Sequence, residues 1–188
     1  MVDAFLEKGL RIQNPKLLDF VENNLFAVLR DIEKFLNRKA FHCSFMAAWG
    51  SRTKGGNLYS MRNLDWEQNS GINKNKLLFV WKVKGTIPHV TIGYPGVIGA
   101  LTGMSKAGLT VHEAGLGSMK ETELGYQWTL RLRFILMHCK NLAEAKEFWL
   151  KTENTFGMNH MVASSADLHS GSAPVFVIET MRGYNAFF

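Results

Sequence analysis

Cys43, Arg62 and Asp65 are the residues whose side chains could together carry out a reaction. A cysteine supplies a thiolate nucleophile, and a neighbouring cation such as a guanidinium favours the thiolate over the thiol. A thiol, a guanidinium and a carboxylate that share one place in a fold therefore indicate a reactive cysteine. Whether they meet depends on the elements that carry them.

The spacing of these residues predicts a β-hairpin that brings them together. Residues 43–49 and 57–64 have the composition of strands, and the turn Lys54-Gly55-Gly56 lies near the midpoint between Cys43 and Asp65. Antiparallel pairing across that turn places Cys43 and the Arg62 to Asp65 segment at the same end. Spacing alone also allows an ordinary buried cysteine beside a structural ion pair, because free cysteines are among the most buried residues.

The rest of the chain alternates short apolar runs with turn residues and then changes to helical spacing. The predicted strands, which form an antiparallel sheet, cover residues 77–83, 89–92, 97–101, 109–112, 161–164 and 174–179. The predicted helices cover residues 16–36, 126–139 and 142–150, with Asn14 and Asn141 as N-caps. Strands grouped with helices on a sheet face predict the α+β class.

Composition excludes several classes of function. The chain has 188 residues and a net charge of +6, but its basic residues are scattered singly, so we expect no nucleic-acid partner. No apolar stretch reaches the ~18 residues of a spanning helix. Two cysteines exclude a disulfide-rich scaffold, and the six histidines show no metal-ligand spacing, so we expect no metal and no other cofactor. Cys139, on a predicted amphipathic helix, is expected to be inert packing.

Cys43-Ser44, a strand, Gly55-Gly56 and then Arg62-Asn63-Leu64-Asp65-Trp66 resemble a group of N-terminal-nucleophile hydrolases. The group contains choloylglycine hydrolase, acid ceramidase and acyl-coenzyme A:6-aminopenicillanic acid acyltransferase, and the last branch is the most similar. Further matching segments follow in consistent order, at residues 101–111, 131–133, 157–164 and 177–181. The resemblance thus covers roughly residues 41–188.

The resemblance implies a four-layer αββα sandwich of antiparallel sheets and a chain that cuts itself before the nucleophile. The cut bond would join His42 to Cys43, and residues 1–42 would be a helical pro-segment. The freed α-amine, with a pKa of ~7.7–8, would act as base toward its own thiol. Arg62 would orient and polarise the Cys43 thiol, and Asp65 would hold the α-ammonium group. Asn159 would donate to the tetrahedral oxyanion, although a turn asparagine is an equally open interpretation.

Three further residues are candidates for binding substrate. Ser105 stands where relatives often have a second oxyanion asparagine, so the resemblance implies either a weakened site or a changed acceptor specificity there. His160, beside Asn159, is predicted to line the pocket. Trp66 is predicted to line an acyl pocket, although aromatic strand positions also pack in cores.

Together these expectations describe a cysteine N-terminal-nucleophile amidohydrolase or acyltransferase, with a small acyl amide or thioester as substrate. The alternative is a non-catalytic relative that acts as an interaction module or is inactive alone. The sequence further predicts that residues 43–188 are the front part of a longer domain, with an exposed sheet edge open to self-association. The compartment stays unknown: cytoplasmic if Met1 is the true start, because no signal peptide follows it, and lysosomal or secreted if the chain is an excerpt.

Overall fold

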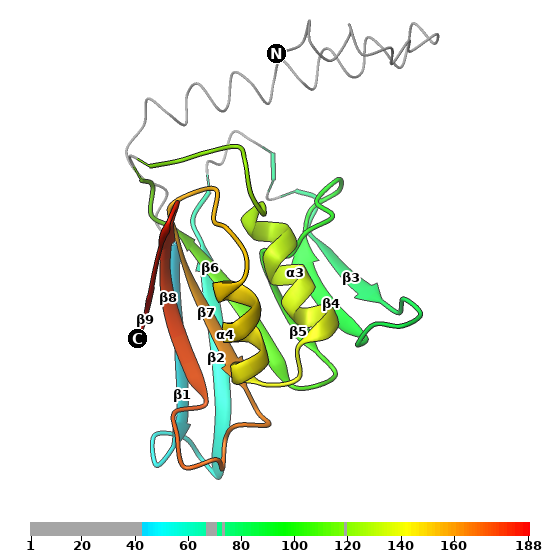
Figure 1. Ribbon diagram of the computed structural model, residues 1–188. Coiled ribbons are helices and arrows are strands. Elements are labelled where there is room, and N and C mark those ends of the chain that lie inside the picture. The colour runs from blue at the N-terminus through cyan, green and yellow to red at the C-terminus, as the bar shows by residue number, and fades with distance from the viewer. Residues whose placement is uncertain (1–42, 67–70, 73, 119) are drawn as a thin grey trace, which may run out of the picture. The chain divides into compact units, whose positions relative to one another are not determined.

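A computed structural model describes residues 43–66, 71, 72, 74–118 and 120–188. All of them belong to one compact unit, residues 40–188. The predicted helix over residues 16–36 and the predicted pro-segment 1–42 lie outside the described residues. Figure 1 shows the helices and strands of this unit.

The predicted hairpin is confirmed. β1 (Cys43–Gly50) pairs with β2 (Gly56–Leu64) in antiparallel register, from Cys43 opposite Leu64 to Ala48 opposite Tyr59. Gly55 and Gly56 in the turn have φ of 75° and 71°, a conformation that glycine adopts without steric cost. The register therefore brings the first residue of β1 to the last residue of β2.

The remaining strands form one antiparallel sheet in chain order, β3-β4-β5-β6-β7-β8-β9. Their bounds are β3 Leu77–Trp81, β4 His89–Gly93, β5 Thr102–Ser105, β6 Leu109–Gly115, β7 Met158–Ser164, β8 Val175–Met181 and β9 Tyr184–Phe187. The strand predicted over residues 97–101 is wrong, because Val97 N donates to Tyr94 O in a turn around Pro95-Gly96 and β5 begins only at Thr102. β9 was not predicted from the sequence.

Both predicted helices of the described unit are confirmed, and they lie between β6 and β7 in the chain. α3 (Trp128–His138) begins after Gln127, whose side chain accepts from the backbone N of Thr129. α4 (Leu142–Leu150) has Asn141 as N-cap, since Glu144 N donates to Asn141 Oδ1 at 2.9 Å. No helix in the described residues is long and apolar enough to cross a membrane.

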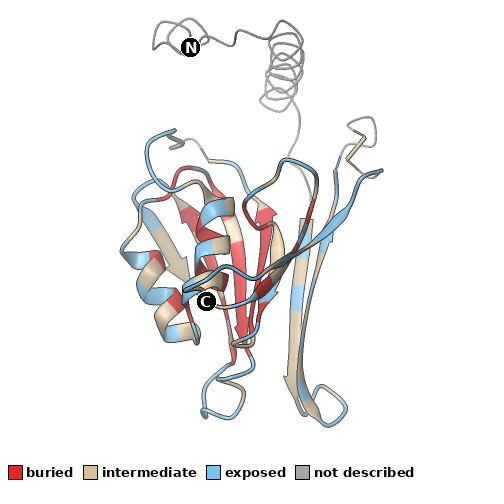
Figure 2. Cartoon of the chain, turned by 90° about the vertical axis from the view of Figure 1, so that its right-hand side faces the viewer, coloured by how far each residue is buried: buried red, intermediate tan, exposed pale blue. Residues whose placement is uncertain are grey.

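The hydrophobic core lies between the two helices and one face of the large sheet, where Figure 2 shows the buried residues. Its fully buried members include Leu132, Ile135 and Leu136 of α3, Ala145 and Trp149 of α4, Leu109 and Val111 of β6, Val162 of β7 and Ile178 of β8. Such a core forms because a sheet and an amphipathic helix each have one apolar side to remove from water.

The hairpin packs on the other face of the large sheet, where Ser60 Oγ of β2 lies 2.9 Å from Thr110 Oγ1 of β6. Helices, large sheet and hairpin are thus three successive layers. They confirm the α+β class and correspond to three layers of the predicted αββα sandwich; a second helical layer is not among the described residues. The outer face of the hairpin carries exposed Met46, Tyr59 and Met61.

Candidate active site

Cys43 is the first residue of β1, and its side chain is half-buried on the hairpin face that turns toward the large sheet. Alternation along β2 places Leu64, Arg62 and Ser60 on that same face. The Nη2 atom of Arg62 lies 3.6 Å from the Cys43 sulfur. The structure therefore brings together the thiol and the guanidinium that the sequence paired.

Arg62 is held in place by Glu113 of β6. Its guanidinium forms an ion pair with the Glu113 carboxylate, and its Nε donates to the Glu113 carbonyl oxygen at 2.7 Å. The two side chains are only 4% and 5% exposed. Burial raises the pKa of Glu113 above its ordinary value, and the charge of Arg62 opposes that shift.

Glu113 is a site residue that the sequence analysis missed. Glu113 directly follows His112, which is the last residue of β6 to pair with β5. On the side of β6 that faces β7, Glu113 pairs with His160. A buried acidic residue within an apolar strand needs a cationic partner. An acidic residue at the end of an apolar strand, as Glu113 is in β6, is therefore the sequence signal that could have indicated this site residue.

Tyr94 lies at the same end of the strands of the large sheet as Glu113, and it was also missed. It follows the end of β4, two residues after Ile92, which pairs with Thr102 at the start of β5. Burial raises the pKa of the Tyr94 phenol, and the charge of Arg62 acts on it in the opposite direction. The phenol is therefore within electrostatic range of the site.

Asp65 and Trp66 directly follow β2. Because Leu64, the last residue of β2, pairs with Cys43, Asp65 lies just past the open end of the hairpin, where Cys43 also lies. Its Oδ1 accepts a hydrogen bond from Asn63 Nδ2 at 2.7 Å, and the side chain is exposed. Trp66 is 45% exposed. The roles predicted for both residues stay predictions.

Asn159 lies on β7, close to Glu113 in the register of the large sheet. It pairs with Ala114 of β6 on one side and with Glu179 of β8 on the other. It is half-buried. The register thus places Asn159 one position from the residue that anchors Arg62, and its role as an oxyanion donor stays a prediction.

Ser105 and His160 are not brought to Cys43. Ser105 is buried at the far end of β5, opposite His89 and beside the turn into β6. The His160 ring is fully buried against Trp149 of α4, with the ring centres 4.7 Å apart. His160 therefore packs under the helices and does not line a pocket beside Cys43.

Cys139 is buried at the end of α3, as predicted for a packing residue, and both cysteines are free thiols. Burial, with smaller effects of Glu144 and Glu147, raises the pKa of Cys139 to about 11. Cys139 is therefore a thiol of low reactivity at neutral pH.

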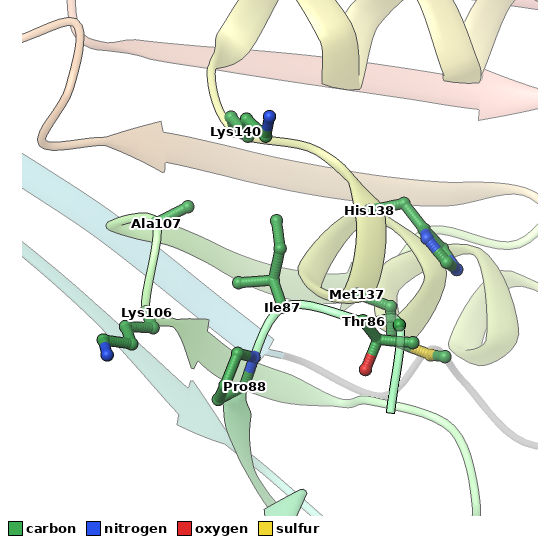
Figure 3. A pocket seen from close by; sticks show the side chains of 9 residues that line it. Thr86, Ile87, Pro88, Lys106, Ala107, Met137, His138 and Lys140 are labelled. Atoms are coloured by element: carbon green, nitrogen blue, oxygen red, sulfur yellow. The ribbon is translucent and has the colours of Figure 1, made fainter. Parts of the chain in front are cut away.

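A hollow of about 520 Å³ lies at the opposite end of β6 from Glu113 (Figure 3). Its wall is formed by residues 85–88, by Lys106 and Ala107 of the β5–β6 turn, and by Met137, His138 and Lys140 around the end of α3. It is thus separate from the Cys43 site. Within the described ranges, no three His, Cys, Asp or Glu side chains gather as they would around a metal ion.

The fold resembles that of a Caenorhabditis elegans N-acylethanolamine-hydrolyzing acid amidase ortholog, with a TM-score of 0.57 and 16% sequence identity. The match covers 78% of this chain and 63% of that chain. The fold is therefore that of the N-terminal-nucleophile hydrolases. The acyl-coenzyme A:6-aminopenicillanic acid acyl-transferase family matches residues 51–175, and the chain belongs to this family. A comparison with curated proteins gives no match.

Proposed function

We propose that this protein is a cysteine amidohydrolase or acyltransferase that acts through an acyl-enzyme on Cys43, after cleavage of the bond between His42 and Cys43. The contact between Arg62 and the Cys43 sulfur carries the proposal, because it places a buried cation beside the only half-buried thiol of the described residues. Family membership supports acyl transfer as the type of reaction.

Cleavage before Cys43 would give its nitrogen a free lone pair. The α-amine would take the thiol proton, and the thiolate would attack the carbonyl carbon of the substrate. Arg62 would stabilise the thiolate, and Asn159 would donate a hydrogen bond to the oxyanion. The α-ammonium, held by Asp65, would return the proton to the leaving amine or thiolate as the carbon–heteroatom bond breaks.

The resulting thioester on Cys43 would then be attacked by water or by an acceptor amine. The α-amine would accept a proton from that nucleophile, and the Cys43 sulfur would leave with its proton restored. Hydrolysis and transfer differ only in the nucleophile of this second step. The substrate class we propose is an acyl amide or a thioester.

The intact mass of the purified protein tests the proposal. The wild-type chain should lose residues 1–42, and Cys43→Ala should stay whole. Cys139→Ala, which removes the other thiol, is the matched control and should be processed like the wild type. A wild-type chain that stays whole and forms no acyl-enzyme with an acyl thioester favours the alternative, a non-catalytic interaction module.

A further inference from the structure

A chain of hydrogen bonds crosses between the hairpin and the large sheet through His112. Its Nε2 lies 3.0 Å from Ser60 Oγ of β2, and its Nδ1 lies 2.7 Å from Thr102 Oγ1 of β5. Ser60 Oγ is also 2.9 Å from Thr110 Oγ1. His112 is 6% exposed, so these hydroxyl groups are its partners in place of water.

The His112 ring is neutral at physiological pH. Burial, with the charge of Arg62 as a smaller cause, lowers its pKa to about 4. A neutral imidazole has one donor and one acceptor nitrogen, and a hydroxyl group can serve either. Both ring nitrogens therefore have hydrogen-bond partners. The two hydrogen bonds fix the orientation of the ring between β2, β5 and β6.

The hydrogen bonds from Ser60 through His112 to Thr102, here called the His112 bridge, lie beside the contacts of the candidate active site. Ser60 is two residues before Arg62 on the same face of β2, and His112 directly precedes Glu113 in β6. The bridge and the Arg62–Glu113 pair thus join the same two strands at neighbouring positions. Hydrogen bonds are directional, whereas apolar contacts alone would allow the sheets to slide.

We propose that His112 is a positioning residue, whose hydrogen bonds to Ser60 and Thr102 hold β2 over β6 so that Arg62 stays against the Cys43 thiol. The inference rests on the proposed function only in taking Cys43 as the nucleophile. Loss of the bridge would let Arg62 move away from Cys43 while the core under the helices remains intact.

Alkylation of the two cysteines by iodoacetamide, followed from pH 5 to 9 by peptide mass spectrometry, tests this proposal without any substrate. Cys43 reports on the site, and buried Cys139 reports on opening of the whole fold. His112→Leu removes both hydrogen bonds at similar volume. His169→Leu makes the same change at an exposed histidine and is the matched control.

In His112→Leu we expect Cys43 alkylation at pH 7 to slow by roughly threefold to tenfold, with its pH profile moved upward and Cys139 still protected. His169→Leu should match the wild type. An unchanged Cys43 profile in folded His112→Leu would overturn the proposal.

If Cys139 becomes reactive in His112→Leu, Ser60→Ala decides, since it removes only the β2 partner. A slower Cys43 in Ser60→Ala supports the bridge, and an unchanged Cys43 overturns it. A wild type without enzymatic activity would count against the proposed function and leave this test intact.

Discussion

Arg62 contacts Cys43 and Glu113 at the same time, with its Nη2 atom 3.6 Å from the sulfur and within the ion pair with the carboxylate. One guanidinium thus connects β1, β2 and β6. Its charge is shared between a group that could become a thiolate and a carboxylate that is buried with it.

Substitution of Arg62 and substitution of Glu113 should therefore change the reactivity of Cys43 in opposite directions. Arg62→Met removes the cation and should slow alkylation of Cys43 at pH 7. Glu113→Gln leaves the cation without its counter-ion and should speed alkylation. Glu113→Gln should also lower the free energy of unfolding by about 3 kcal/mol or more, because a buried charge loses its partner. Alkylation kinetics and urea denaturation measure the two effects, and equal changes in both variants would contradict this account.

Arg131 should be essential for the stability of the helical layer. Its Nη2 donates to the carbonyl oxygens of Trp149 in α4 and of Thr152 just after α4, at 2.9 and 3.1 Å, and its guanidinium also donates to Asn154. Arg131→Met would leave these acceptors unsatisfied in a buried place, at a cost of about 3 kcal/mol or more in the free energy of unfolding. Thermal and urea denaturation test this, with exposed Arg182→Met as a control that should stay near the wild type.

Gly103 should tolerate no side chain, because α3 packs directly on β5 there. A Cβ atom at Gly103 would lie 2.5 Å from Val90 O and 2.7 Å from Leu136 Cδ1. Gly103→Ala should therefore destabilise the fold by roughly 1–3 kcal/mol. Gly93→Ala in β4 is the matched control, since its Cβ would come no closer than 3.6 Å to Phe79. Equal melting temperatures for the two variants would show that α3 can shift without cost.

Acid should destabilise the protein through its buried histidines. Burial lowers the pKa of His89, His112 and His160, so the unfolded chain binds protons below pH ~6.5 that the folded chain does not. Stability should fall as the pH drops from ~6.5, and the share of His112 should reach about 3 kcal/mol near pH 4.

His112→Leu should accordingly lose less stability than the wild type between pH 7 and 4 in urea denaturation. The raised pKa of Glu113 acts in the opposite direction, but it is present in both proteins and cancels in the comparison. His169→Leu should keep the wild-type slope, and a wild-type slope in His112→Leu would show that His112 is protonated in the folded protein.

Local patterns in the sequence were sufficient for the hairpin and for α4. The position of the Gly55-Gly56 turn set the pairing of Cys43 with Leu64, and Asn141 with Glu144 marked the start of the helix. Both depend on residues close in the chain. The strand expected at residues 97–101 failed because Pro95-Gly96 makes a turn whose hydrogen bond extends to Val97.

The rest of the site depends on how the two sheets stack, which no local pattern encodes. Glu113 meets Arg62 across 51 positions of the chain, and His112 meets Ser60 across 52. His160 was misplaced because the packing of the helices on the large sheet is equally non-local: the sequence showed its neighbour Asn159 but not the helix tryptophans that cover its ring.

Among the residues that the structure describes, β1 pairs with residues that follow it in the chain, from Cys43 opposite Leu64 onward. A break in the chain before Cys43 would therefore remove none of the hydrogen bonds of the hairpin. The new chain end would remain anchored at its first residue. Maturation of such a chain would need no refolding of the strand that carries the nucleophile.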